Sequence, residues 1–263
     1  MQAGSLRYIT QRIPTMNDAN VLLEFLKMPL GNSDEIFKKF STLPGAIHRG
    51  IALEQFLFVK GKRDDRVLLV AHADTYWDNR LQSNENKPQE IFEEQGIIRN
   101  AHGGLGADDR AGCAILWLLK DMGHSLLITD GEERGGCGSD WLMNENQDIA
   151  DEINDNHQFV IQFDRRNGKD FKCYSVGTDE FRLYVQQATG YSEPNRSAFT
   201  DIVTLCRRIT GVNLSIGYRN EHTDDEHLVL QEWQHTLDVC RTWLSQVGLP
   251  RFKRNDKTAS LYF

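Results

Sequence analysis

The chain has 263 residues, of which 40% are hydrophobic and 26% are charged, and it contains only 6 prolines. This composition excludes a disordered or low-complexity chain and supplies enough apolar residues for a sizeable core. Lys and Arg number 30 against 38 Asp and Glu. The resulting net charge of −8 argues against binding to nucleic acid, because affinity for phosphates needs clustered basic side chains.

The apolar runs and the cysteines indicate where such a chain functions. The longest apolar run, Cys113 to Leu119, is far shorter than the roughly 20 residues that cross a bilayer. Residues 1–14 lack the apolar stretch of a secretory signal. The 5 cysteines are scattered singly, which is typical of reduced thiols and not of a disulfide framework. We expect a soluble, cytoplasmic protein with no membrane partner, and the sequence leaves the oligomeric state open.

Short apolar runs alternate with helical patterns along the chain. Helices are expected at residues 20–27, 34–40, 109–122, 139–146, 180–187, 198–209 and 231–246, and strands at 55–60, 66–71, 125–129, 158–163 and 213–216. Runs such as VLLVA and FVIQF are apolar on both faces, which is typical of a parallel sheet covered by helices on both sides. The pattern predicts a three-layer α/β fold, with a mostly parallel central sheet flanked by helices.

We expect a single catalytic domain over residues 1–263, because no linker or internal repeat divides the chain. The polar stretch at about 78–104 is predicted to form an exposed loop. Residues from about 251 to 263 are predicted to form a loosely held tail.

Histidines and carboxylates follow the apolar runs. Because the carboxyl ends of parallel strands meet at one edge of a sheet, these side chains are expected to lie close together. His72 and Asp74 share one face of their strand, since side chains two positions apart point the same way. Imidazole and carboxylate are the ligands that a pair of divalent transition metals takes. The candidate ligands are His72, Asp108, Glu133, Asp164 and His222, with Asp74 and Glu132 beside them.

Five motifs in this order, HAD, GLGADDRAG, TDGEERGGCGS, QFDRR and NEHT, resemble those of the co-catalytic zinc exopeptidases. That group includes peptidase T, bacterial leucyl aminopeptidase and carboxypeptidase G. The resemblance runs from about residue 66 to residue 244 and implies two zinc ions, although cobalt or manganese also suits such ligands. It implies that His72 and Asp164 bind one metal, that Glu133 and His222 bind the other, and that Asp108 bridges the two.

The resemblance also assigns the two remaining carboxylates. Asp74 would orient His72, and Glu132 would be the general base that takes a proton from a metal-bridging water and passes it to the leaving amine. The choice of Asp108 over Asp109 as the bridge rests on the resemblance alone. Asp109 fits equally well as a carboxylate in the first turn of the following helix.

The segment between Asp164 and His222 is too short for the inserted lid or dimerisation domain of carboxypeptidase G, so the chain resembles the compact aminopeptidases of the group. Contacts that a lid would make with substrate must then come from elsewhere. Candidates for these contacts are Arg165, Arg166, Tyr218 and His102, since guanidinium groups suit a substrate carboxylate.

Taken singly, each motif has a structural explanation, such as a helix cap at Asp108 or a turn at Glu132 and Glu133. Their combination favours a metal-dependent exopeptidase, most simply an aminopeptidase acting on a short peptide. Two alternatives stay open. One is a deacylase or carboxypeptidase-like amidohydrolase acting on a carboxylate-bearing substrate such as an N-acyl amino acid, and the other is a non-catalytic binding module. Glutaminyl cyclisation on a single zinc is disfavoured, because all five ligand positions are filled.

Overall fold

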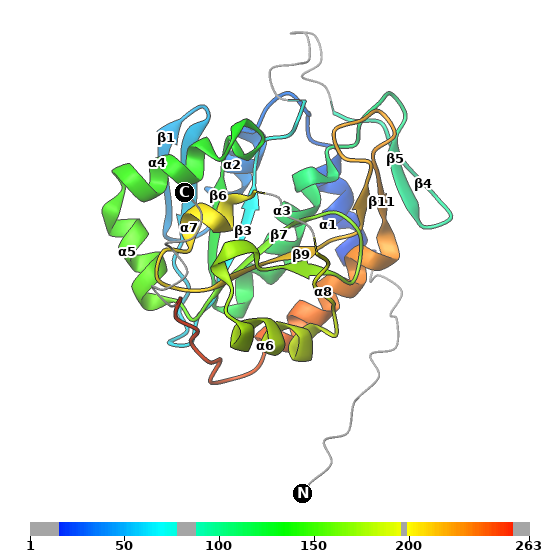
Figure 1. The fold of residues 1–263 in the computed structure, drawn as a ribbon. Coiled ribbons are helices and arrows are strands. Elements are labelled where there is room, and N and C mark those ends of the chain that lie inside the picture. Colours follow the sequence, from blue (N-terminus) through cyan, green and yellow to red (C-terminus); the bar gives the residue numbers. More distant parts are fainter. Residues whose placement is uncertain (1–15, 78–87, 196–198, 255–263) are drawn as a thin grey trace, which may run out of the picture.

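The structure is a computed structural model that describes residues 16–77, 88–195 and 199–254 (Figure 1). The α-helices are α1 (Met16–Leu26), α2 (Asp34–Phe40), α3 (Ala107–Leu119), α4 (Cys137–Glu145), α5 (Gln147–Asn156), α6 (Asp179–Thr189), α7 (Asp201–Leu205) and α8 (Leu230–Leu244). Short 3-10 helices are η1 (Lys120–Met122), η2 (Glu132–Arg134) and η3 (Tyr174–Val176). The strands are β1 (Ala46–Ile51), β2 (Glu54–Val59), β3 (Leu68–His72), β4 (Ile91–Glu94), β5 (Ile97–Asn100), β6 (Ser125–Thr129), β7 (Val160–Arg165), β8 (Phe171–Lys172), β9 (Gly211–Ser215), β10 (Tyr218–Arg219) and β11 (His227–Val229).

The main sheet has the strand order β1-β2-β6-β3-β7-β9-β8. Its four central strands, β6, β3, β7 and β9, run parallel, and antiparallel strands complete both edges. Side chains alternate between two apolar clusters along β3: Leu69 and Ala71 pack with α1, α3 and α8, whereas Leu68 and Val70 pack with α4, α5 and α7. Figure 1 shows these two groups of helices on opposite faces of the sheet. The three-layer α/β fold predicted from the double-sided apolar strands is confirmed.

The order of the central strands places a crevice at the carboxyl end of β3. From β3 the chain passes through α3 to β6 on one side, and then through α4 and α5 to β7 on the other side. Helices that leave neighbouring strands toward opposite faces open such a crevice, where α/β proteins bind their ligands. His72, the last residue of β3, therefore lies at the point where this architecture favours a site.

Close packing of α3 against the sheet depends on Gly112, the last residue of the GADDRAG motif. A Cβ at this position would lie 2.1 Å from the backbone oxygen of Phe163 and 2.2 Å from Oδ1 of Asp109. Both distances are far below van der Waals contact, and one of the two atoms belongs to backbone. The glycine lets the helix approach β7 directly below the candidate ligands.

A second, smaller sheet has the order β10-β11-β5-β4. It corrects the prediction of an exposed loop at about 78–104, because residues 91–100 fold into the hairpin of β4 and β5. The hairpin was missed because its strands are polar and half-exposed, with Ile98 as their only buried residue, so they lack the alternation that marks a strand. Residues 78–87 of the predicted loop lie outside the described residues.

Other boundaries also differ from the sequence prediction. The stretch QDIADEINDN, which reads as polar, forms α5, and the helix predicted over 198–209 is the shorter α7. The predicted tail is wrong for residues 251–254. Phe252 is buried against Phe159, Phe181 and Tyr184, and Lys253 forms a bridge with Ile209. Residues 255–263 of the tail lie outside the described residues. Within the described ranges, none of the helices combines the length and apolar character needed to cross a membrane.

His157 joins the end of α5 to the main sheet as a neutral imidazole. Its Nδ1 lies 3.1 Å from the backbone oxygen of Glu152 and 3.2 Å from that of Ile153, so it donates to this helix end. Its Nε2 lies 2.8 Å from Oγ of Ser125 and accepts from that hydroxyl. Burial, together with the charge of Arg66, lowers the pKa of His157 to about 4.

This lowered pKa predicts a pH-dependent loss of stability. As the pH falls below about 6.5, His157 in the unfolded chain takes up a proton, whereas in the folded chain it stays neutral until about pH 4. The free energy of unfolding should therefore decrease across this window, with a contribution from His157 on the order of 3 kcal/mol. Replacing His157→Gln should remove that contribution. Urea unfolding of both metal-free proteins at pH 7, 5.5 and 4 measures it, and identical pH slopes would contradict the assignment.

Candidate metal centre

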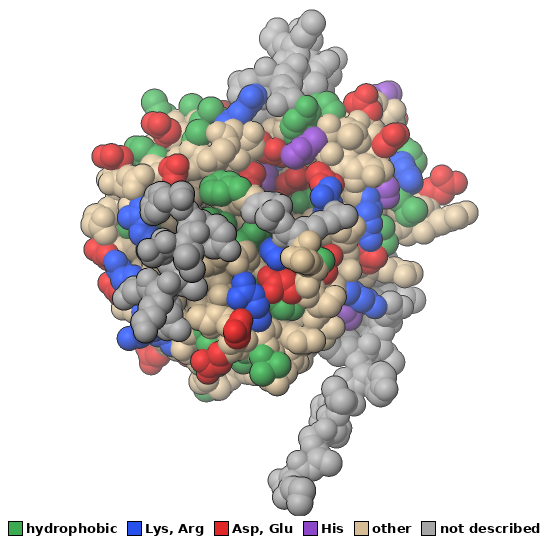
Figure 2. Space-filling model, in the orientation of Figure 1, with side chains coloured by type: hydrophobic (Ala, Val, Ile, Leu, Met, Phe, Trp, Pro, Cys, Tyr) green, Lys and Arg blue, Asp and Glu red, His purple; other side chains and the backbone are tan. Residues whose placement is uncertain are grey.

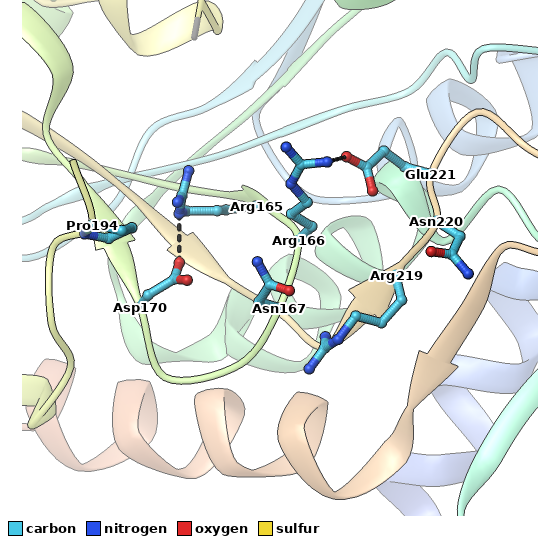
Figure 3. A pocket seen from close by; sticks show the side chains of 8 residues that line it. All are labelled: Arg165, Arg166, Asn167, Asp170, Pro194, Arg219, Asn220 and Glu221. Carbon is cyan, nitrogen blue, oxygen red and sulfur yellow. Dashed lines mark hydrogen bonds and ion pairs between the residues drawn. The ribbon is translucent and has the colours of Figure 1, made fainter. Parts of the chain in front are cut away.

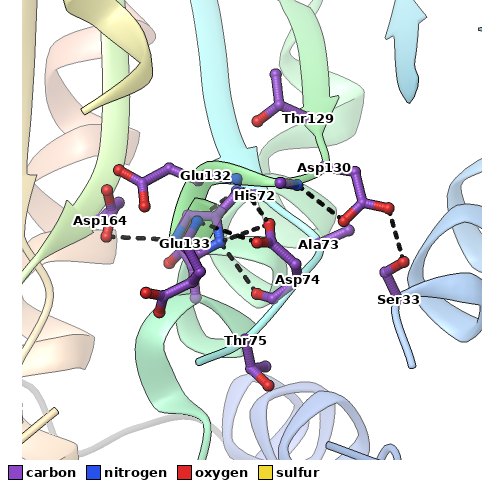
Figure 4. Close-up of polar contacts among 12 residues, drawn as sticks. Ser33, His72, Ala73, Asp74, Thr75, Thr129, Asp130, Glu132, Glu133 and Asp164 are labelled. Carbon is purple, nitrogen blue, oxygen red and sulfur yellow. Dashed lines mark hydrogen bonds and ion pairs between the residues drawn. The ribbon is translucent and has the colours of Figure 1, made fainter. Parts of the chain in front are cut away.

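The candidate ligands come from five separate parts of the chain and meet at the carboxyl end of the main sheet. They are His72 at the end of β3, Asp108 at the start of α3, Glu133 in η2, Asp164 in β7 and His222 in the loop between β10 and β11. Figure 4 shows His72, Glu132, Glu133 and Asp164 converging on one point. On the face drawn in Figure 2, acidic side chains gather around a histidine in a hollow, with Lys or Arg side chains beside them.

The ligand atoms form two groups, each within 4.8 Å. One group contains His72, Glu132 and Asp164, and the other contains Asp108, Glu133 and His222. Two candidate metal groups of histidine and carboxylate are therefore present, consistent with a co-catalytic centre. The resemblance assigns Glu132 to proton transfer, but its carboxylate also lies close enough to His72 and Asp164 to bind the same metal ion.

Asp108 connects the two groups through its two carboxylate oxygens. Its Oδ1 lies 3.1 Å from Nε2 of His72, and its Oδ2 lies 3.3 Å from Nε2 of His222. The same His222 nitrogen lies 2.8 Å from Oε1 of Glu133, and Nε2 of His72 lies 3.5 Å from Oδ1 of Asp164. A carboxylate that faces both histidines has the placement required of a bridging ligand.

Asp109, which is joined to Asp108 by a cis peptide bond, uses both of its carboxylate oxygens in bonds to backbone N–H groups. Its Oδ1 accepts from the backbone N–H of Gly112 at 3.0 Å, which caps α3. Its Oδ2 accepts from the backbone N–H of His72 at 3.1 Å, which fixes the end of β3 to the helix. Asp108 thus lies among the candidate ligands, whereas Asp109 holds the backbone around them.

Asp74 orients both His72 and the turn that carries Glu132 and Glu133. Its backbone oxygen lies 3.0 Å and its Oδ1 3.3 Å from Nδ1 of His72, so this nitrogen is the donor and Nε2 is left to face the centre. Its carboxylate accepts from the backbone N–H groups of Glu132 at 3.2 Å and Glu133 at 3.1 Å. This turn begins at Gly131, whose φ of 68° is a conformation that favours glycine.

Asp164 receives hydrogen bonds from three neighbours that fix its carboxylate. Tyr218 donates from its hydroxyl to Oδ1 at 3.2 Å, whereas Thr200 and Gln162 donate to Oδ2 at 2.8 and 3.0 Å. Tyr218 was predicted as a substrate contact, but it is buried and its hydroxyl points at a candidate ligand. The geometry makes it a residue that positions Asp164.

The electrostatics of the centre reflect crowded acidic groups. Burial, and then the charge of Asp164, raises the pKa of Glu132 well above its usual range. Hydrogen bonds that His222 donates to Asp108 and Glu133 raise its pKa to about 10. Burial alone would lower the pKa of His72, but its hydrogen bonds with Asp108 and two further aspartates outweigh that effect and raise it. Both shifts act in the direction that favours the charged imidazole, next to carboxylates that would otherwise repel one another.

The donor set fits two divalent cations. Each group offers one imidazole and two carboxylates, a mixture that suits zinc and other first-row transition metals. Imidazole ligands commonly donate their second nitrogen to a carboxylate or backbone oxygen, as His72 does to Asp74. His222 is supported by Tyr76, whose ring stacks on the imidazole with centroids 4.6 Å apart.

The other predicted substrate contacts, Arg165, Arg166 and His102, are each paired with an acid. Arg165 and Arg166 follow Asp164 and are ion-paired with Asp170 and Glu221 in the loops beside it. His102 lies just after β5, where its exposed side chain pairs with Glu90. The two arginines line a cavity together with these acids (Figure 3), whereas His102 lies next to the small sheet.

Glu226 was not singled out in the sequence, yet it fixes the segment that carries Asp108. This buried carboxylate accepts from the backbone N–H of Gly106 at 2.6 Å and of Asp108 at 3.1 Å. Burial, and then the charge of Asp108, raises its pKa to about 7. In the run HTDDEH it stands beside Asp224 and Asp225, both exposed, and no local signal separates the three. Only the tertiary structure shows which acid points inward.

Comparison of the structure with solved structures identifies the fold. Aminopeptidase PepT from Bacillus cereus superposes with a TM-score of 0.62 at 14% identity, covering 87% of this chain and 97% of that chain. The TET1 peptidase of Pyrococcus horikoshii gives 0.62 at 14% identity, covering 88% and 100%. A glutaminyl cyclase from an Acidobacteriales bacterium gives 0.58 at 15% identity, covering 91% and 98%. No protein-family model matches the sequence, and no curated protein matches it.

These similarities define the class of fold: the chain has a zinc exopeptidase-like fold, as the motifs implied. The neighbouring structures include peptidases and a cyclase, so the fold by itself does not select one reaction. The chemistry has to be argued from the residues at the centre.

Replacing Glu226→Gln should weaken metal binding about 10- to 100-fold, as is typical when the hydrogen-bond partners of a metal site are lost. The amide keeps one acceptor and turns a donor toward the second backbone N–H, so the segment that carries Asp108 is no longer fixed. Competition with a zinc indicator measures the affinity. Asp225→Asn, an exposed change in the same loop, is the matched control and should bind zinc as the unchanged protein does. Equal affinities for both variants would refute this role.

Proposed function

We propose that the protein is a two-metal aminopeptidase that cleaves short peptides, acting as one catalytic domain, and that the cytoplasm is its location. The observation that carries the proposal is the pair of histidine and carboxylate groups joined by Asp108, with Glu132 at their edge. The fold likeness to aminopeptidases supports it. His72, Asp164, Asp108, Glu133 and His222 would hold the metals. Two bound divalent cations, zinc in the first place with cobalt or manganese as substitutes, supply Lewis-acid activation of water and of the scissile carbonyl.

Glu132 is proposed to move the proton. A base must give the proton to the leaving amine after taking it from the attacking water, which requires a carboxyl group with a pKa near the working pH. Burial and the charge of Asp164 raise the pKa of Glu132 in this direction. The backbone N–H of Glu132 donates to Asp74, which fixes the position of Glu132 in η2. Asp74 also keeps Nε2 of His72 directed at the centre.

Replacing Glu132→Gln should lower kcat by at least about 100-fold, since a positioned acid and base contributes that much or more. The variant should still bind two metal ions per chain, which elemental analysis measures. Binding of one ion instead of two would show that Glu132 serves as a ligand of the group that contains His72 and Asp164. A fully active variant would refute its role as the base. Exposed Glu145→Gln, at the end of α4, is the matched control and should change neither quantity.

A deacylase or carboxypeptidase-like amidohydrolase is the second candidate, favoured by Arg165 and Arg166 beside Asp164. Such an enzyme uses the same bond chemistry but takes a substrate with a blocked amine and a free carboxylate. A non-catalytic binding module would bind metal and peptide without turnover, and the complete set of candidate ligands argues against it.

Peptides that differ only at their amino end distinguish the candidates. We expect Ala-Ala and Ala-Ala-Ala to be cleaved by the zinc-loaded protein, and their N-acetylated forms to be cleaved at least about tenfold more slowly, since one lost charged hydrogen bond has that effect. Mass spectrometry of the products measures both rates. Faster cleavage of the N-acetyl forms would favour the deacylase, and absence of any cleavage would favour the binding module.

A further inference from the structure

Asp201 is a fully buried carboxylate to which the proposed reaction assigns no role. It is the first residue of α7 and is 0% exposed. Its Oδ2 accepts a hydrogen bond from the hydroxyl of Thr129, whereas its Oδ1 has no hydrogen-bond partner. Among the residues that the structure describes, no Lys or Arg forms an ion pair with it. Because a buried charge without a partner is costly, a compensating charge is expected nearby.

Helix α7 covers the face of the main sheet toward which the candidate ligands point. Alternate side chains of β6 and β3 belong to the apolar cluster that contains Ile202 of α7. By this alternation Thr129, at the end of β6, and His72, at the end of β3, point toward the same face. The strand order β6-β3-β7 places His72 between Thr129 and Asp164. Three polar side chains therefore stand in a row above the start of α7.

The start of α7 is hydrogen-bonded to the strands on both sides of His72. On one side Asp201 accepts from Thr129 of β6. On the other side Thr200, the residue before α7, donates to Oδ2 of Asp164 in β7 at 2.8 Å. Two consecutive residues thus reach both neighbours of β3. The carboxylate of Asp201 therefore lies close to the candidate metal group that contains His72 and Asp164.

The charges around Asp201 agree with this placement. Burial raises the pKa of Asp201 to about 6, and His72 and Asp74 are the charged groups that act on it. The charge of Asp201 is in turn one of the causes that raise the pKa of Glu132. Because its pKa is higher in the folded than in the unfolded chain, ionised Asp201 destabilises the metal-free fold at neutral pH. A divalent cation at the group that contains His72 would compensate this charge.

We propose that Asp201 is a positioning residue of the metal centre, whose buried and uncompensated charge favours a cation at the group that contains His72 and Asp164 without being a ligand. The inference rests on the proposed two-metal function. The same charge destabilises the metal-free chain, because no cation compensates it there. Asp201 therefore has two effects of opposite sign: it lowers the stability of the metal-free chain and raises the metal affinity of one group.

Replacing Asp201→Asn tests both effects in the full-length protein. The amide keeps the shape of the side chain and an oxygen that can accept from Thr129, but it removes the charge. We expect the metal-free variant to melt at least about 2 °C higher than the unchanged protein at pH 7.5, because a buried charge is lost. We expect its affinity for one of two zinc ions to fall about 10- to 100-fold, as when other supporting residues of metal sites are lost. Circular dichroism during heating and competition with a zinc indicator measure the two quantities.

Two ligand variants identify the ion that is affected. His222→Ala leaves the group that contains His72, and there Asp201→Asn should weaken zinc binding. His72→Ala leaves the other group, and there Asp201→Asn should have no effect. Asp18→Asn is the matched control, because Asp18 is also a buried aspartate but is ion-paired with Arg241 at 2.7 Å. It should lower the melting temperature of the metal-free protein and leave both zinc affinities unchanged.

A merely structural Asp201 would give the opposite sign in the melting experiment. A lower melting temperature of metal-free Asp201→Asn, or zinc affinities equal to those of the unchanged protein, would overturn the proposal. None of these measurements uses catalysis, so they separate the proposal from the proposed function. Absence of peptide cleavage by the zinc-loaded unchanged protein would overturn the aminopeptidase function alone. Failure of the unchanged protein to bind zinc would overturn both.

Discussion

The two oxygens of Asp108, each facing a different histidine, are the contact on which the centre depends. His72 belongs to the main sheet, whereas His222 lies in a loop of the small sheet, and Asp108 at the start of α3 is the candidate ligand between them. Several residues around Asp108 fix its position. Asp109 joins α3 to the end of β3, and Glu226 accepts a hydrogen bond from the backbone N–H of Asp108. Gly112 lets the helix approach the sheet. A carboxylate buried among other carboxylates persists only where such bonds, and positive charge, compensate it.

The net charge of −8 takes on a specific meaning in this setting. Part of the acidic excess consists of carboxylates that gather in one hollow. Hydrogen-bond donors stabilise them, and so do His72 and His222, whose pKa values are raised. Three arginines line a separate cavity, and each of them is ion-paired with an acid.

The sequence predicted much of this arrangement, and most of the parts it missed depend on tertiary contacts. Apolar runs gave the central strands, and the rule that parallel strands end at one edge brought His72, Glu133 and Asp164 together. Those inferences rest on strong local patterns. The β4–β5 hairpin was missed because its polar composition carries little pattern, and tertiary pairing with β11 stabilises it. In α5 the residues Ile149, Ala150 and Ile153 do recur at helical spacing, so this helix was missed although its sequence carries a local pattern. Glu226 and Tyr218 could not be assigned because burial decides their roles, and burial of one acid in a run of three is a property of the fold.

The small sheet divides the support of the centre between two frameworks. Strands β10 and β11, which flank the loop with His222, pair with each other, and β11 pairs with β5 of the hairpin. His72, Glu133 and Asp164 lie on strands of the main sheet or on the turn that follows one of them, whereas Asp108 lies at the start of α3, which follows β5 of the small sheet. The spacing of the two candidate metal groups therefore depends on how the two sheets pack against each other. Residues 91–100 pair with β11 and lead into α3, so they support both His222 and Asp108. Changes along this hairpin should consequently affect the candidate group that contains Asp108 and His222 before the group that contains His72, without altering any candidate ligand.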